Sequence, residues 1–522
     1  MDTTEAAAPV KLSHREILIV FSGLMLGLLL ASLDQTVVST ALPTIVGELG
    51  GLDHLSWVVT AYLLTSTASV PLYGKISDLY GRKIVFQAAI LFFLLGSLLA
   101  GASQNMVQLI AFRGIQGIGG GGLMAMSMAI IGDIVSPRER GRYSGYLGAV
   151  FAFSSIAGPL MGGFFTDQLS WRWLFYINLP LGGLALVVTS AVLKLPTTRA
   201  RHRIDFEGSA LLVGAVTSLL LVSVWGGNEY EWASPQILGL GVLGVVLSLL
   251  FVLQERRAAE PLLPLRLFRD PIVSVSSLLA FLVAAGMFGG IVFLPLFLQV
   301  VTEASATASG LMLVPLMAGV LSMSILSGKI ITRTGRYRMW PITGAALATA
   351  GMALLSRLDA SSSRLDTSVG MIVLGLGLGM TMQVLVLVVQ NAAPYRDLGV
   401  ATSAVNFFRS MGGAFGVAVF GAVLASRLAA ELPANVDGAS LANSPEQSRA
   451  LPPEQASLVV DALASAIHTV FIVAIPVMAL AFAVSWFLRE IPLRDTVHVG
   501  IDDPLTQPAV EAGVLATASS PA

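Results

Sequence analysis

The sequence predicts an all-α polytopic membrane protein with 14 transmembrane helices, and three observations predict it. The chain of 522 residues is 55% hydrophobic and only 12% charged, about half the charged fraction of an average soluble domain. Apolar runs of about 18 residues or more recur along its whole length. Lys and Arg gather in alternate loops, which is the pattern of cytoplasmic loops.

The predicted spans are separated mostly by short loops. They cover residues 17–43, 55–74, 84–103, 107–132, 143–166, 173–193, 208–226, 236–254, 272–298, 308–328, 340–356, 368–391, 399–425 and 465–488. At a rise of about 1.5 Å per residue, each can cross a hydrocarbon core of about 30 Å.

The loop charges orient the chain. Loops on the N-terminal side hold 23 Lys and Arg residues, whereas the opposite loops hold 5. The positive-inside rule therefore places both termini in the cytoplasm of a multi-pass cell-membrane protein. The net charge of -1 gives no reason to expect nucleic acid, and the absence of Cys excludes disulfides and thiolate metal sites.

The first span carries the most informative residue, Asp34, in the run Leu33-Asp34-Gln35-Thr36-Val37-Val38. A carboxylate in hydrocarbon costs several kcal/mol unless it is neutralised, paired or wet, so such a residue is a functional candidate. An acid that changes between charged and neutral forms is what a proton-coupled protein needs.

The turn between the second and third spans has the spacing G-x-x-x-D-x-x-G-R-K. Its residues are Gly74, Asp78, Gly81, Arg82 and Lys83. The glycines permit a tight turn, and the charges favour a latch between domains over a simple positive turn. A weaker copy, Gly328-Lys329-Ile330 and Thr334-Gly335-Arg336, follows the tenth span and indicates an internal repeat.

The fourth span holds Arg113, which requires an interior partner because a central Arg is costly in the bilayer. Helix rise places Asp34 about 12 Å and Arg113 about 9 Å below the outer surface. We therefore hypothesise a proton-linked pair, with a static structural salt bridge as the alternative.

Two later spans carry unusual residues. The fifth ends in Gly158-Pro159-Leu160-Met161-Gly162-Gly163, where the glycines permit close packing and Pro159 predicts a kink. The thirteenth contains Arg409 well inside it, and no spanning segment of the second half contains an acid to pair with it. Backbone carbonyls, a water-filled cavity or an acid from the first half remain possible partners.

Together these motifs resemble the major facilitator superfamily, and specifically its 14-span drug:proton antiporter family. The segment from Trp171-Arg172-Trp173 to Pro180 is similar to that family as well. The resemblance implies two six-helix halves plus two extra central spans, with a substrate pocket between the halves whose access alternates.

The implied parts of the chain run in this order. They are a cytoplasmic segment 1–16, an N-terminal half 17–193, a linker 194–207, a two-helix hairpin 208–254, a linker 255–271, a C-terminal half 272–488 with a long external loop 426–464, and a disordered cytoplasmic tail 489–522.

The resemblance also implies roles for single residues. Asp34 and Arg113 would serve proton coupling, and the Gly74–Lys83 turn would latch the cytoplasmic gate against the second half. The antiporter motif would be Gly158, Pro159, Gly162 and Gly163, which argues for export. Many relatives carry a second-half membrane acid that is missing here, which favours neutral, zwitterionic or monocationic substrates.

The substrate pocket should be apolar and aromatic with few polar groups. Its candidate residues are Trp57, Tyr62, Gln116, Met124, Phe151, Phe293, Phe297, Gln299, Met382, Gln383, Asn406 and Phe407. Helix packing or lipid contact is the competing explanation for each aromatic or Met side chain.

These residues predict a monomeric exporter of amphipathic drugs or of a self-produced metabolite, with a small amphipathic substrate, protons and the lipid bilayer as partners. Uptake, or export of one dedicated metabolite or lipid, is the alternative within transport. A membrane receptor or enzyme is the alternative of another class. The five His residues are scattered and no catalytic grouping or ATP-binding loop appears, so we expect no enzyme, no cofactor and no metal, with the proton gradient as energy source.

Overall fold

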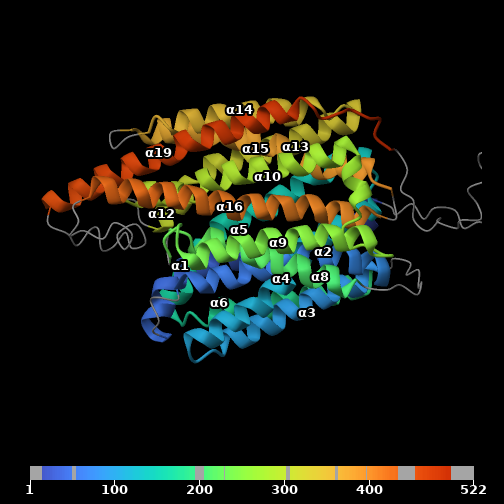
Figure 1. The fold of residues 1–522 in the computed structure, drawn as a ribbon, viewed down its shortest axis with the longest axis horizontal. Helices are drawn as coiled ribbons and strands as arrows, with labels where there is room; N and C mark the ends of the chain where they lie inside the picture. Colours follow the sequence, from blue (N-terminus) through green and yellow to red (C-terminus); the bar gives the residue numbers. More distant parts are fainter. Residues whose placement is uncertain are drawn as a thin grey trace, which may run out of the picture.

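A computed structural model describes residues 14–49, 55–193, 205–227, 230–300, 306–358, 362–394, 397–432 and 453–494. These parts form a bundle of long, roughly parallel helices (Figure 1). Most of the predicted N-terminal segment 1–16, of the linker 194–207 and of the tail 489–522 lies outside the described residues, and so do residues 433–452 of the predicted external loop.

The first half of the bundle comes from the first seven helices. They are α1 (His14–Leu49), α2 (Leu55–Tyr80), α3 (Arg82–Gly101), α4 (Met106–Ile134), α5 (Pro137–Gln168), α6 (Trp173–Tyr176) and α7 (Asn178–Val192). Helix α4 packs against α2 and α3, and α1 packs against α5 and α7. The sixth predicted span is thus two helices, α6 and α7.

A hairpin and the second half follow. The elements are α8 (Phe206–Trp225), α9 (Pro235–Arg257), the 3-10 helix η2 (Leu265–Arg269), α10 (Pro271–Ile291), α11 (Leu294–Val300), α12 (Ala306–Met312), α13 (Val314–Thr334), α14 (Met339–Leu355), α15 (Arg364–Ala392), α16 (Leu398–Glu431) and α19 (Pro453–Ser485). Figure 1 shows the second-half helices gathered on one side of the bundle and α1 to α4 on the other.

Several helices begin at a capping side chain, which explains where the loops end. Asn105 accepts a hydrogen bond from the Gln108 backbone N–H at the start of α4, and Ser136 does the same for Glu139 at α5. Such caps satisfy backbone donors that have no partner within the helix. Proline in the first turn reinforces the start of α5, α9 and α10.

Twelve helices of the described chain are long and apolar enough to cross a membrane. They match 12 of the 14 predicted spans. The other two predicted spans are helices, α2 and α14, but they are not among these twelve. Helix α2 is less apolar because it contains Thr65, Ser66, Thr67 and Ser69, and α14 has only 17 residues.

The helix ends correct several predicted boundaries. Helix α1 extends to Leu49 rather than residue 43, and α2 reaches Tyr80 rather than residue 74. The predicted external loop 426–464 is shorter at both ends than expected, because α16 runs to Glu431 and α19 begins at Pro453. The ninth and tenth spans are each divided, into α10 with α11 and α12 with α13.

Several helix contacts join the halves, and two of them are the most extensive. Helix α5 packs against α13, and α2 packs against α16. Helix α8 contacts both α2 and α16, so the extra hairpin lies beside the junction of the two halves. Any change in how the halves meet therefore moves α2 and α5 relative to α16 and α13.

Candidate proton-coupling and gating sites

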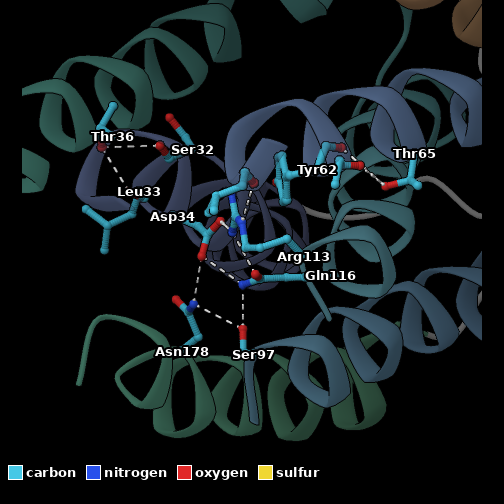
Figure 2. Close-up of polar contacts among 12 residues, drawn as sticks. Ser32, Leu33, Asp34, Thr36, Tyr62, Thr65, Ser97, Arg113, Gln116 and Asn178 are labelled. Carbon is cyan, nitrogen blue, oxygen red and sulfur yellow. Dashed lines mark hydrogen bonds and ion pairs between the residues drawn. The ribbon is translucent and has the colours of Figure 1, made fainter. Parts of the chain in front are cut away.

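The Asp34 carboxylate lies at the centre of a buried polar cluster inside the first half (Figure 2). Asp34 is 1% exposed, and so is Arg113. Arg113 Nη1 lies 2.5 Å from Asp34 Oδ2, which is the ion pair expected from their depths. Gln116 Nε2 donates to Asp34 Oδ1 at 2.7 Å, and Asn178 Nδ2 donates to the same oxygen at 3.2 Å.

Arg113 has further partners that do not depend on Asp34. Its Nε donates to the Val58 carbonyl at 3.2 Å, and its Nη1 donates to Gln116 Oε1 at 2.6 Å. The guanidinium also stands over the ring of Tyr62, 4.3 Å from the centroid. Arg113 therefore keeps hydrogen-bond and cation–π partners even when the Asp34 charge is removed.

Close helix packing brings this cluster together. A Cβ at Gly96 would lie 2.4 Å from the Gln116 backbone nitrogen, so only glycine lets α3 approach α4 this closely. A Cβ at Gly117 would lie 2.2 Å from Thr65 Oγ1, which fixes α2 against α4 in the same way.

Two residues of the cluster were missed by the sequence analysis as site residues. Ser97 Oγ accepts from both Gln116 Nε2, at 2.6 Å, and Asn178 Nδ2, at 3.1 Å. Both are buried polar residues in apolar helices, with Ser97 0% and Asn178 1% exposed. That polarity within an apolar run was the available signal.

Helix α5 meets α1 on either side of Asp34. Thr36 Oγ1 donates to the Ser154 carbonyl at 3.0 Å, and the Ser32 and Ser154 hydroxyls share a 2.5 Å hydrogen bond. A Cβ at Gly158 would lie 2.1 Å from Thr36 Oγ1. Within the predicted antiporter motif, Gly158 thus provides the contact surface for α1, while a Cβ at Gly163 would meet nothing within 4 Å.

The predicted gate turn divides its contacts between the two halves. Asp78 Oδ2 accepts from the Val400 backbone N–H of α16 at 3.1 Å, and Asp78 Oδ1 pairs with Arg82 at 2.6 Å. Arg82 also pairs with Asp133 of α4 at 2.7 Å. Burial raises the pKa of Asp78 to about 6, against the lowering effect of Arg82.

The other three turn residues have different roles. A Cβ at Gly74 would lie 2.4 Å from Ser403 Oγ, so glycine permits the approach of α16. Gly81 has a φ of 92°, a conformation that favours glycine between two helices. Lys83 Nζ donates to the Ser190 carbonyl of α7 at 2.7 Å, a contact within the first half.

A second contact between the halves was not predicted. Gln390 of α15 accepts from Arg140 Nη1 at 2.6 Å and donates to the Met128 carbonyl at 3.0 Å, so it bonds twice to the first half. It also donates to Thr402 Oγ1 of its own half at 3.0 Å. Burial lowers the pKa of Arg140 to about 9.

The weaker copy of the turn makes the reciprocal contact. Arg138 Nε of α5 donates to the Thr332 carbonyl of α13 at 3.3 Å. Gly335 follows α13 with a φ of 72°, and Gly81 follows α2 with a φ of 92°, so both turns hold a glycine at positive φ. Both turns thus face a helix of the opposite half.

The predicted pocket residues fall into three groups. Tyr62 and Gln116 belong to the Asp34 cluster. The second group packs against other side chains of the bundle. Phe293, Phe297 and Phe407 are buried in the hydrophobic core, and Met124 and Phe151 pack against that core. Trp57 packs against Trp225 of the hairpin, and Gln299 forms a hydrogen bond with Ser309. Met382 and Gln383 are partly exposed, and Asn406 is buried.

The C-terminal end of α1 makes a separate set of polar contacts. Trp171 Nε1 donates to Glu48 Oε2 at 2.8 Å, and Arg172 forms an ion pair with the same carboxylate. The hydrogen bond from Arg172 holds the pKa of Glu48 below its usual value. The described residues hold no group of three or more His, Asp or Glu side chains that could bind a metal ion.

A two-halved bundle of long apolar helices with a buried acid–base pair is typical of multi-pass membrane transporters. The sequence profile of the Major Facilitator Superfamily matches residues 24–417, so the chain belongs to that superfamily and is not an enzyme.

Known proteins agree with this assignment. An "Uncharacterized MFS-type transporter" of Mycobacterium tuberculosis is 41% identical over 489 residues, covering 93% of this chain and 71% of that protein. "Multidrug resistance protein 3" of Bacillus subtilis is 34% identical over 514 residues, covering 96% and 99%. The crystal structure of the human organic anion transporter MFSD10 (TETRAN) matches the fold with a TM-score of 0.61 at 17% identity, covering 92% of this chain and 100% of that one.

Proposed function

We propose that this protein exports small amphipathic molecules in exchange for protons, by alternating access between its two halves. The observation that carries the proposal is the buried Asp34–Arg113 pair inside the first half. The relative named as a multidrug resistance protein supports export of this substrate class, and so does the Gly158–Gly163 motif.

The topology belongs to the same proposal. Fourteen spans, with α2 and α14 added to the 12 apolar helices, place both termini in the cytoplasm. The bias of 23 to 5 basic loop residues supports this orientation. The end of the bundle that carries the Gly74–Lys83 turn is then the cytoplasmic end.

Protonation of Asp34 is the proposed coupling step. The ionised carboxylate accepts from Arg113, Gln116 and Asn178. A proton on Asp34 removes the charge that holds Arg113, while Arg113 keeps Val58, Gln116 and the Tyr62 ring. The neutral form therefore loosens α1 from α4 without leaving a buried cation unpartnered.

The contacts of α1 carry this change toward the second half. Thr36 and Ser32, on either side of Asp34, bond to Ser154 of α5. Helix α5 in turn packs against α13, where a Cβ at Gly148 would lie 3.1 Å from Leu321. A shift of α1 thus reaches the junction of the halves through one intervening helix.

The Asp78 and Gln390 contacts hold the cytoplasmic ends of the halves together. In this arrangement the substrate path is closed toward the cytoplasm. Export requires these contacts to break and re-form in each cycle, with the proton on Asp34 changing the balance between the two arrangements.

The decisive measurement is substrate transport into inverted vesicles, driven by a pH gradient, with wild type and Asp34→Asn. Asparagine keeps the shape of the side chain but cannot ionise, so we expect gradient-driven transport to fall at least about tenfold. Uphill transport by Asp34→Asn at the wild-type rate would leave the pair with only a structural role.

Glu48→Gln is the matched control. Glu48 also belongs to α1 and also pairs with an arginine, but it lies at the outer end and is half-exposed. We expect this variant to keep its proton coupling. Substrate movement in the opposite direction under the same gradient would favour the uptake alternative.

A further inference from the structure

Arg409 of α16 is a cation inside a predicted membrane span. No described residue forms an ion pair with it. Helix rise places it about 16 Å from the start of α16 at Leu398, near mid-membrane. It forms no ion pair or hydrogen bond with another residue in the described parts of the chain, and its side chain is partly exposed. An arginine at this depth needs a partner, because a buried unpaired charge is costly.

The helix geometry shows where Arg409 points. Gly399 and Ser403 of α16 face α2, and Gly412 and Gly416 face α10. Arg409 projects between these two directions, on the same face as Thr402, which lies two turns earlier. Because Thr402 bonds to Gln390 of α15, Arg409 points toward the interior between α2, α10 and α15 and not toward lipid.

Other polar groups without partners lie at the same level. The hydrogen bond between Gln390 of α15 and Thr402 of α16 sets a common level on these antiparallel helices. Gln383 is seven residues before Gln390, and Arg409 is seven residues after Thr402. Gln383 and Arg409 therefore lie at the same level along the bundle. Gln383 is partly exposed and makes no hydrogen bond with another described residue. One turn away, Asn406 is 2% exposed and its Oδ1 has no partner in the described chain.

This group is separate from the proton-coupling cluster. Arg113 bonds to Val58 of α2, whereas Ser403 meets Gly74 of that helix, which places Arg409 opposite Ala68. The ten residues from Val58 to Ala68 correspond to about 15 Å along the bundle. A substrate group at Arg409 would therefore leave Asp34 free to bind and release protons.

We infer that Arg409 binds an anionic group of the transported molecule, and that the substrates are amphipathic compounds with one carboxylate or a similar acidic group. A carboxylate matches the donor fork of arginine, and Gln383 offers a further amide donor. Asn406 Oδ1 is free to accept from a hydroxyl or ammonium group of the same molecule, which includes zwitterions. The inference rests on the proposed function, because it names the substrate class of that transporter.

The test is equilibrium binding to the purified full chain in nanodiscs of zwitterionic lipid, measured by calorimetry. Three probes share one ring system: naphthalene-2-carboxylate, its carboxamide and 2-naphthylmethylammonium. We expect wild type to bind the carboxylate at least about tenfold more tightly than the other two. Arg409→Gln should remove that preference, and Arg409→Lys should retain most of it.

Arg427→Gln is the control, since Arg427 belongs to the same helix but is exposed at its far end. It should bind all three probes as wild type does. A wild type that does not prefer the carboxylate, or an Arg409→Gln protein that folds and keeps the preference, overturns the inference. If Arg409→Gln does not fold, the inference is tested by the carboxylate preference of wild type and by whether Arg409→Lys retains it.

This outcome is distinguishable from failure of the proposed function. Binding at equilibrium needs no proton gradient, so a carboxylate preference that depends on Arg409 would stand even if Asp34→Asn transported normally. Conversely, loss of coupling in Asp34→Asn with no carboxylate preference in wild type would leave the antiporter proposal intact and reject only the anion site.

Discussion

At the scale of single residues, the structure separates two buried carboxylates by what surrounds them. Asp34 is held by one arginine and two amides within the first half. Asp78 lies where the halves meet, with Arg82 on one oxygen and the Val400 backbone N–H on the other. The first arrangement lies within one half, whereas the second joins the two halves.

The raised pKa of Asp78, about 6, gives a signed prediction. A state that buries Asp78 binds its proton more tightly than a state that exposes it to water, where an Asp pKa is about 3.9. Lowering the pH from about 7 to about 4 should therefore increase the fraction in which the halves are closed at the Gly74–Lys83 turn, with most of the change below about pH 6.

The chain has no Cys, so two spin labels can be placed cleanly at Ile84 and Thr334, exposed residues of the opposite halves near the gate turn and its weaker copy. The short-distance population measures the closed fraction. In Asp78→Asn the fraction should change less over this pH range, because only the contribution of Asp78 is removed. A wild-type closed fraction that falls with decreasing pH contradicts the assigned sign.

At the scale of elements, the contact between α15 and the first half depends on one amide. Gln390→Leu removes a hydrogen bond from a charged donor, Arg140, and one to the Met128 carbonyl. Such bonds contribute about 1–3 kcal/mol each when a buried partner is left unsatisfied. The ratio of closed to open states should fall at least about tenfold, measured with the same spin-label pair.

Thr402→Val is the matched control for this element. It removes the Gln390 bond that stays within the second half and leaves both bonds between halves in place. We expect its closed-to-open ratio to remain within about threefold of wild type. Equal effects of the two variants would mean that Gln390 acts through its own half and not as a latch.

At the scale of the whole molecule, the number of membrane spans depends on whether α14 crosses the bilayer. Its 17 residues correspond to about 25 Å, just short of a typical hydrocarbon core of about 30 Å. If α14 crosses the membrane, Arg336 and Arg357 at its two ends lie on opposite sides.

Single cysteines at Arg336 and at Arg357 test this directly, because both side chains are exposed and no other Cys interferes. In intact cells an impermeant maleimide should label Arg357→Cys and not Arg336→Cys. Labelling of both positions from one side would place α14 on the membrane surface and change the topology to an odd number of spans.

The sequence by itself determined the helical membrane architecture, because hydrophobic runs and loop charges act locally and can be counted along the chain. It also indicated the pairing of Asp34 with Arg113, since helix rise converts residue number into depth. Only the tertiary structure decided the lateral neighbours. Ser97 and Asn178 beside Asp34, and Gln390 beside Arg140, come from helices far apart in sequence. Depth can be read from one helix, whereas the face that one helix presents to another depends on the packing of all of them.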